Sequence, residues 1–173
     1  MSKKRKHSSD SDSVDSDRFC IVGGLVIDKD DYSVIKPILQ WQTWDETATL
    51  IIDEEGRVQT LSCSAGTRSI PPSIGRLQEL KELDLSWCRW AKWTNKHTSI
   101  PDEIGNLRNL IKLNLNGSAL RSLPSIGQLR NLKELNLRRT YELTSLPDEI
   151  GNLRNLIKLS LDPVVRSLPP SIG

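Results

Sequence analysis

The chain is poor in the residues that build most catalytic and metal sites. Its 173 residues include three cysteines and two histidines. The cysteines (Cys20, Cys63 and Cys88) are odd in number and form no C-x-x-C pair, which argues against a disulfide framework or a zinc site. The sequence also holds no phosphate-binding glycine loop. We therefore expect no catalytic residues, cofactor, metal or small-molecule substrate, and no enzyme.

Long apolar runs are missing as well. No stretch approaches the roughly 18 apolar residues that a membrane-spanning helix needs, and the first twenty residues are charged. We expect no membrane partner and a cytoplasmic protein, with the nucleus as the alternative. The net charge is only +2. From residue 58 onward, 16 lysines and arginines face 10 carboxylates, an excess too small to predict a nucleic-acid partner.

Residues 1–18 have almost no apolar side chains, so they cannot offset the entropy of ordering and are predicted to be disordered. Lys3–Lys6 form a basic cluster, and aspartates alternate with serines after it. This tail has two interpretations. One is a nuclear import signal beside an acidophilic kinase site at Ser9, and the other is a solubilising tail.

Residues 19–57 contain apolar runs, unlike the tail before them, and form the predicted entry or capping segment. In TLIIDEEGRV, residues 49–58, the turn-prone D-E-E-G separates two β-prone runs. This arrangement predicts a hairpin.

From residue 58 to residue 173 the chain repeats itself. DEIGNLRNLIKL occurs unchanged at residues 102–113 and 148–159. The Ile-Gly pairs begin at Ile74, Ile104, Ile126, Ile150 and Ile172, in steps of 30, 22, 24 and 22. Such a period indicates a solenoid, in which each repeat supplies one layer. One step is about seven residues longer than the others.

The repeats match L-x-x-L-x-L-x-x-N/C-x-L, as in Leu80, Leu83, Leu85 and Cys88. They resemble leucine-rich repeat proteins, and S-[IL]-P-x-x-I-G-x-L resembles the plant intracellular Ras-group and disease-resistance repeats. The resemblance implies an α/β solenoid: a horseshoe segment with a parallel β-sheet on the concave side and short helical or 3-10 turns on the convex side. About five layers are expected, the last cut short. The resemblance also implies recognition of a protein partner.

Elementary geometry supports this architecture. L-x-L alternation sends the leucines of each strand to one face and the intervening side chains to the other. Proline with an acidic or serine pair suits the start of a short helical turn, and we expect the following glycine to permit the reversal. The sequence stops part-way through a repeat, from which we expect a longer protein or an end that a partner covers.

Outward-facing strand positions fall into columns across the predicted sheet. The first column alternates in charge and largely satisfies itself, and no column contains an aromatic anchor. The candidate partner-binding residues of the concave face are Glu82, Asp84, Lys112, Asn114, Asn116, Glu134, Asn136, Arg138 and Lys158.

The long step between repeats contains SWCRWAKWTNKHTS, residues 86–99. Trp90 takes the register position that Leu120 holds in its own layer and is predicted to be core. Trp87, Trp93 and Lys96 are the second set of candidate partner-binding residues, because tryptophans interleaved with cations can bind by cation–π contact. The alternative is that the rings pack on one another and bind nothing.

We therefore predict a non-catalytic intracellular protein–protein interaction module, in signalling or immune-type recognition, with protein partners and no nucleic-acid partner. The alternatives are a recognition fragment of a larger signalling enzyme, such as a kinase or a nucleotide-binding protein, and a nuclear protein that uses its basic amino-terminal cluster.

Overall fold

The computed structural model describes residues 19–22, 25–39, 49–62, 70–86, 99–123, 126–165 and 168–170. The predicted tail, residues 1–18, lies outside the described residues. In chain order the elements are β1 (Phe19–Val22), β2 (Leu25–Asp28), α1 (Lys29–Leu39), β3 (Thr49–Ile52), β4 (Val58–Ser62), the 3-10 helix η1 (Pro72–Arg76), β5 (Glu82–Asp84), η2 (Asp102–Asn106), β6 (Lys112–Asn114), η3 (Ile126–Gln128), β7 (Glu134–Asn136), η4 (Asp148–Asn152) and β8 (Lys158–Ser160).

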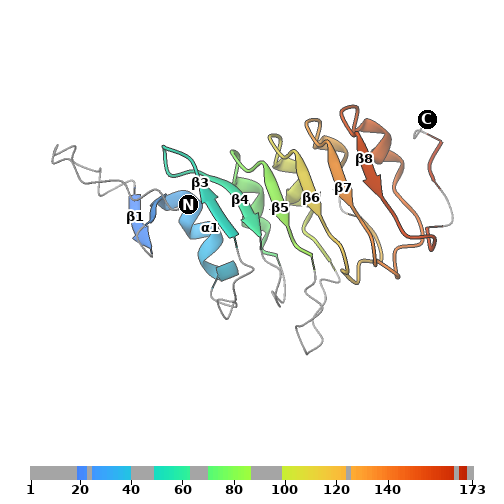
Figure 1. Ribbon diagram of the computed structural model, residues 1–173, viewed down its shortest axis with the longest axis horizontal. Coiled ribbons are helices and arrows are strands. Elements are labelled where there is room, and N and C mark those ends of the chain that lie inside the picture. Colours follow the sequence, from blue (N-terminus) through green and yellow to red (C-terminus); the bar gives the residue numbers. More distant parts are fainter. Residues whose placement is uncertain are drawn as a thin grey trace, which may run out of the picture.

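A six-stranded sheet in the order β3-β4-β5-β6-β7-β8 runs along the molecule, and the 3-10 helices lie behind it (Figure 1). β3 and β4 form the predicted antiparallel hairpin, and every later pair is parallel. The predicted α/β solenoid is confirmed. The strands on either side of the long step pair in register, with Leu83 opposite Leu113.

Leucines at the same height in each layer form the core. The second position of β5, β6 and β7 holds Leu83, Leu113 and Leu135, each 1% exposed. Their neighbours on either side in the same strands face out, as period-two alternation requires. The leucine after each strand is buried too, so two leucines per strand close each layer against the next. In the last described layer, Leu159 and Leu161 are only partly buried.

A proline opens each of the longer 3-10 helices on the convex side. Pro71, Pro101 and Pro147 are the N-caps of η1, η2 and η4, with φ of −71°, −65° and −69°. Proline has its φ pre-set near these angles and lacks the N–H that a helix start leaves unpaired, so it favours this start. The predicted role of these prolines is confirmed.

The glycine of each Ile-Gly pair has a different role from the one predicted. Among the described glycines, only Gly56 and Gly117 have a positive φ, so the reversal does not depend on Gly75 or Gly127. A Cβ on Gly75 would lie 2.4 Å from the backbone oxygen of Glu103 in the next layer. On Gly127, a Cβ would lie 2.9 Å from the backbone oxygen of Glu149. These glycines therefore set how closely neighbouring layers approach.

The small polar residues that follow the strands differ in how well they are satisfied. The Thr140 hydroxyl donates to the backbone oxygen of Leu137 at 2.6 Å, as expected for a residue in the place of the usual asparagine. Ser118 is 2% exposed, and its hydroxyl has no hydrogen-bond partner among the described residues. Ser118 therefore does not make the bond that Thr140 makes at the equivalent position. The repeat positions of Cys63 and Cys88 predict buried thiols, and Trp90 is predicted to be core. All three lie outside the described residues.

α1 covers the first layer and was not predicted from the sequence as a helix. Asp28 begins it, since its Oδ1 accepts the N–H of Asp30 at 3.0 Å. Val34, Ile35 and Ile38 are buried in the same core cluster as the leucines. The helix thus replaces the neighbour that the first repeat lacks.

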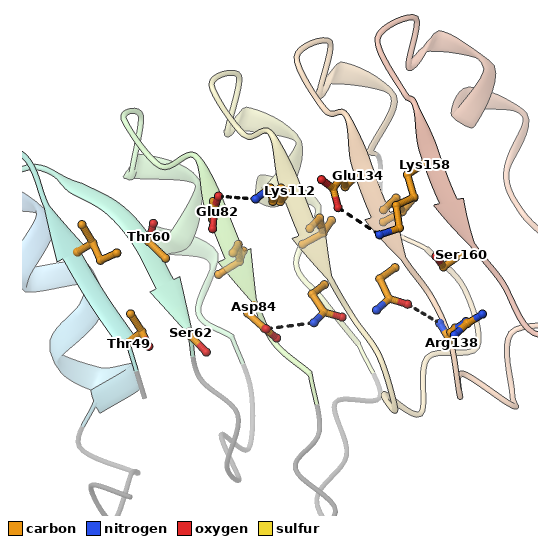
Figure 2. Close-up of a pocket in the computed structure, with 16 residues that line it drawn as sticks. Thr49, Thr60, Ser62, Glu82, Asp84, Lys112, Glu134, Arg138, Lys158 and Ser160 are labelled. Atoms are coloured by element: carbon orange, nitrogen blue, oxygen red, sulfur yellow. Dashed lines mark hydrogen bonds and ion pairs between the residues drawn. The ribbon is translucent and has the colours of Figure 1, made fainter. Parts of the chain in front are cut away.

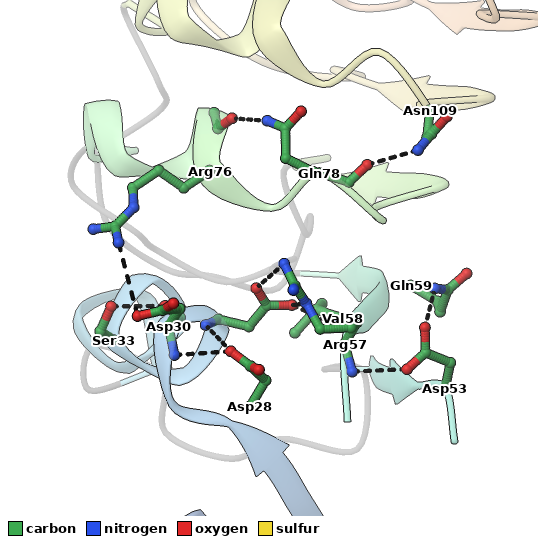
Figure 3. A network of polar contacts seen from close by, with 12 residues as sticks. Asp28, Asp30, Ser33, Asp53, Arg57, Val58, Gln59, Arg76, Gln78 and Asn109 are labelled. Atoms are coloured by element: carbon green, nitrogen blue, oxygen red, sulfur yellow. Dashed lines mark hydrogen bonds and ion pairs between the residues drawn. The ribbon is translucent and has the colours of Figure 1, made fainter. Parts of the chain in front are cut away.

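A buried carboxylate joins α1 to the repeat sheet (Figure 3). Asp31 is 1% exposed; its Oδ2 accepts the Val58 N–H at 2.8 Å, and its Oδ1 lies 3.0 Å from Arg57 Nη2. Burial alone would lower the pKa of Arg57, but the hydrogen bond and attraction to Asp31 outweigh it and raise that pKa. Arg57 therefore stays charged, and its ion pair with Asp31 anchors the cap.

Glycine 75 provides a test of the layer spacing. We expect Gly75→Ala to lower the free energy of unfolding by about 1–3 kcal/mol, because the new methyl group must push the next layer's backbone away. Urea denaturation followed by circular dichroism measures this. Arg76→Ala, at the neighbouring exposed position, is the control and should stay close to the parent. Equal stability of Gly75→Ala and the parent would show that the layers are not in close contact.

The cap anchor provides a second test. We expect Asp31→Ala to lower the free energy of unfolding by about 3 kcal/mol, because it leaves the buried Val58 N–H and the Arg57 guanidinium without their acceptor. The matched control is Asp30→Ala, whose side chain is 84% exposed and lies 3.9 Å from Arg76. Equal losses in the two variants, in the same denaturation assay, would contradict a specific role for Asp31.

Candidate functional site

The concave face of the sheet carries a groove with a volume of about 610 Å³ (Figure 2). Six strands line it, from β3 to β8. Its residues are Thr49, Ile51, Thr60, Ser62, Glu82, Leu83, Asp84, Lys112, Leu113, Asn114, Glu134, Leu135, Asn136, Arg138, Lys158 and Ser160. The groove includes eight of the nine concave-face candidates. The ninth, Asn116, lies just beyond it.

The first column of the groove runs Thr60, Glu82, Lys112, Glu134, Lys158, in the register that the sequence predicted. Lys112 Nζ lies 2.9 Å from Glu82 Oε1, and Lys158 Nζ lies 3.7 Å from Glu134 Oε2. The column is therefore two ion pairs rather than one continuous ladder. Their side chains are 44–67% exposed, so each pair contributes little to stability.

The second column provides the groove's amides. Asn114 Nδ2 donates to Asp84 Oδ2 at 3.0 Å, which links β6 to β5. Asp84 Oδ1 accepts the Ser86 N–H at 2.8 Å, and Asn136 Oδ1 accepts the Arg138 N–H at 3.1 Å. The last two bonds fix the orientation of the Asp84 and Asn136 side chains, because each accepts a backbone N–H two residues later in the chain. No hydrogen bond to another described residue occupies the Asn136 amide donors, so they are available to a partner's backbone carbonyl.

The groove continues past the ends of the strands into a second hollow of about 600 Å³, which Asn136 and Arg138 share with the groove. Here Asn116 has a buried Oδ1 without a hydrogen-bond partner among the described residues. Asp162 accepts a hydrogen bond from the Arg139 N–H. Tyr141, which is 59% exposed, supplies an aromatic ring.

Sequence reasoning missed several residues of this surface, among them Thr49, Ile51 and Tyr141. Thr49 and Ile51 line the groove because β3 extends the sheet. The predicted hairpin could have revealed them, because Ile51 pairs with Thr60 and so faces the same way. Tyr141 lies in a turn, where no strand periodicity places it. The insertion candidates Trp87, Trp93 and Lys96 lie outside the described residues, so their role stays a prediction.

Within the described part of the chain, no helix has the length and apolar character that a membrane-spanning helix needs. No group of three or more histidine, cysteine, aspartate or glutamate side chains in the same part of the chain is arranged to hold a metal ion.

Comparison with known proteins identifies the fold family. A family model described as "Leucine-rich repeat region" matches residues 57–173. The chain belongs to the leucine-rich repeat family. The repeat region is thus one of a family of protein-interaction modules, as the sequence resemblance implied. No curated protein matches the chain in a sequence search.

Several solved structures are similar to parts of the chain. A leucine-rich repeat protein of Leptospira interrogans is 32% identical over 80% of this chain, with a TM-score of 0.57, and the match spans 36% of that protein. The plant peptide hormone receptor RGFR1, in complex with RGF2, is 38% identical over 64% of this chain and 17% of its own, with a TM-score of 0.46. The BIR3–SERK2 complex from Arabidopsis thaliana matches at 26% identity over 70% of this chain and 64% of that one, with a TM-score of 0.46.

The pairing of the first column is testable by titration. The hydrogen bond that Lys112 donates to Glu82, the charge of Glu82 and the charge of Glu134 raise the pKa of Lys112 above its ordinary 10.5, whereas desolvation lowers it. The stabilisation from this shift is present below pH 10.5 and is lost as pH rises through the raised value. In Glu82→Gln we expect the Lys112 titration midpoint to fall, as measured by NMR of labelled lysines. Glu142→Gln is the control, and an unchanged midpoint in Glu82→Gln would contradict the pairing.

Proposed function

We propose that this protein is a non-catalytic recognition module that binds an extended segment of a protein partner in the concave groove. The observation that carries the proposal is the register of the groove. Polar side chains from five parallel strands stand in two aligned columns, and the amides of the second column are oriented by their own backbone. Such a surface suits a peptide backbone, whose carbonyl and N–H groups recur at regular intervals.

The chemistry of the lining supports binding rather than catalysis. The groove's titratable groups are carboxylates, lysines and one arginine, and the carboxylates Glu82 and Glu134 face lysines at 2.9 and 3.7 Å. A general base needs a partner with a matched pKa and a reacting atom between them. Neither histidine of the chain, His7 or His97, falls among the described groove residues.

The balance of contacts supports selective recognition of moderate strength. None of the residues that line the groove is aromatic, so it lacks the large anchors that dominate most tight interfaces. Ile51, which is 51% exposed, gives the β3 end an apolar position, and Tyr141 gives the other end a ring. A partner with apolar residues at both ends of a polar stretch fits this order.

We further propose that the module acts inside the cell, in signalling or recognition. The odd number of cysteines, three, supports a reducing compartment. The Lys3–Lys6 cluster is compatible with nuclear entry. A fusion of the chain to a fluorescent protein, compared with a variant in which these four residues are alanine, tests the compartment directly.

Partner capture tests the groove. With the full chain as bait in an extract of the source cells, we expect Asn136→Lys to lose most of the specifically captured protein, because the longer cation fills the centre of the groove. Captured proteins are quantified by mass spectrometry, and thermal unfolding confirms that the variant folds. Arg76→Ala, on the convex side, is the control. Full retention by Asn136→Lys, with loss in Trp93→Ala, would move the binding surface to the insertion.

A further inference from the structure

One edge of the solenoid carries charge that the groove does not use. We define it by the turns that join each 3-10 helix to the following strand, residues 77–81, 107–111, 129–133 and 153–157, and call it the strand-entry edge. In Figure 1 these turns form the row of loops along the top of the molecule. They lie on a different side of the repeat from the groove, so this surface is independent of the proposed function.

Arginines repeat along this edge. Arg108, Arg130 and Arg154 occupy the same position in three consecutive layers, and all three are exposed. None of them has an ion pair or a side-chain hydrogen bond with another described residue. Neighbouring strands of a sheet lie about 4.8 Å apart, so the three cations stand in one short row. Three like charges at this spacing repel one another, and an anionic partner would relieve the repulsion.

The backbone of the row is held in place by a ladder of asparagines. Asn131 Nδ2 donates to the Arg108 backbone oxygen at 2.9 Å, and Asn155 Nδ2 donates to the Arg130 backbone oxygen at 2.7 Å. Each arginine N–H also donates into its own 3-10 turn, at 2.8 Å for Arg108 and Arg130 and 2.9 Å for Arg154. The spacing of the arginines is therefore built into the fold, whereas their side chains remain free to meet a ligand.

A second row beside the arginines is partly apolar. It reads Ile111, Lys133, Ile157 in the same three layers. Ile157 is 81% exposed, the largest exposure among the large hydrophobic side chains of the described residues, and Lys133 is exposed as well. The repeated segment DEIGNLRNLIKL thus places an arginine and, three positions later, an isoleucine on this edge in two of the layers.

The width of the basic strip discriminates between polyanions. Six residues before Arg108 and Arg154, η2 and η4 begin with the acidic pairs Asp102–Glu103 and Asp148–Glu149. The surface becomes negative within the same layer, so the positive strip is narrow. It suits a single extended chain with carboxylates and apolar side chains, and it lacks the breadth and aromatic platforms of a nucleic-acid surface.

We propose that the strand-entry edge, made of Arg108, Arg130, Arg154, Lys133, Ile111 and Ile157, is a second docking surface, and that it binds an acidic segment of a partner protein with apolar residues between its carboxylates. The carboxylates pair with the arginine row. The apolar side chains cover Ile111 and Ile157, whose burial on binding adds affinity that a purely acidic chain would not gain.

Fluorescence anisotropy with a defined probe tests the proposal. The probe is a labelled peptide, EELEELEELEE, and its matched control peptide has glutamine in place of each glutamate. We expect the full chain to bind the probe and not the control peptide. Because three exposed ion pairs are lost together, the triple variant Arg108→Ala, Arg130→Ala, Arg154→Ala should bind the probe about tenfold more weakly. Ile157→Ser should weaken binding severalfold without altering its salt dependence.

A second triple variant controls for total charge. Lys36→Ala, Arg76→Ala, Arg121→Ala removes the same charge from exposed positions off the edge and should bind the probe like the parent. Thermal unfolding verifies each variant, and Arg130→Glu alone provides a milder test of the row. Parent-like binding by the edge triple, or equal weakening by the control triple, would overturn the proposal. Tighter binding of the single strand dT12 than of the probe, at the same salt, would overturn it in favour of a nucleic-acid surface.

Discussion

The close stacking of one layer on the next is the constraint on which the rest of this structure depends. Leucines at equal heights fill the space between layers, and at Gly75 and Gly127 the backbone of the next layer comes so near that no Cβ fits. Parallel hydrogen bonding then fixes the register of each strand against its neighbour. Once the register is fixed, every outward side chain belongs to a column, and the columns make both the groove and the strand-entry edge. Function in such a repeat is therefore a matter of what each column contains.

Much of this could be predicted because the two periods involved are local. L-x-L alternation places Glu82 and Asp84 on one face of a strand, and the repeat length places Lys112 and Asn114 beside them. The long step did not disturb the prediction, because the Leu83 and Leu113 positions are set by the motif around each strand and not by the number of residues between them. For the same reason the extent of the groove was under-predicted at β3. Thr49 and Ile51 precede the first repeat and follow from the hairpin register instead.

The distances between layers could not be predicted from a single sequence. An Ile-Gly pair suggests a turn, and only the position of the Glu103 backbone reveals that Gly75 serves close packing. The alternating charges of the first column suggest a continuous ladder of ion pairs, but Lys112 and Lys158 each pair with only one described glutamate. α1 was not predicted because Pro37, inside it, argues against a helix. Asp28 at its start and the spacing of Val34, Ile35 and Ile38 nevertheless indicate a helix with one buried face. Its anchor, Asp31, pairs with a residue 26 positions away, which no local pattern predicts.

The two surfaces differ in how far their charges are already satisfied, and this difference decides how each can bind. In the groove, Glu82 and Glu134 form ion pairs with Lys112 and Lys158. A ligand that binds one member of a pair leaves the other without its partner and must also neutralise that charge. Selectivity follows from this exchange more than affinity does, since mismatched ligands leave a charge uncompensated. On the strand-entry edge the arginines have no described partner to lose, so the proposed anionic segment would form its ion pairs without breaking existing ones, against desolvation, screening and side-chain entropy. The proposed binding at the edge is therefore expected to weaken as salt is added, whereas the proposed binding in the groove is expected to depend mainly on the fit of hydrogen bonds to the second column.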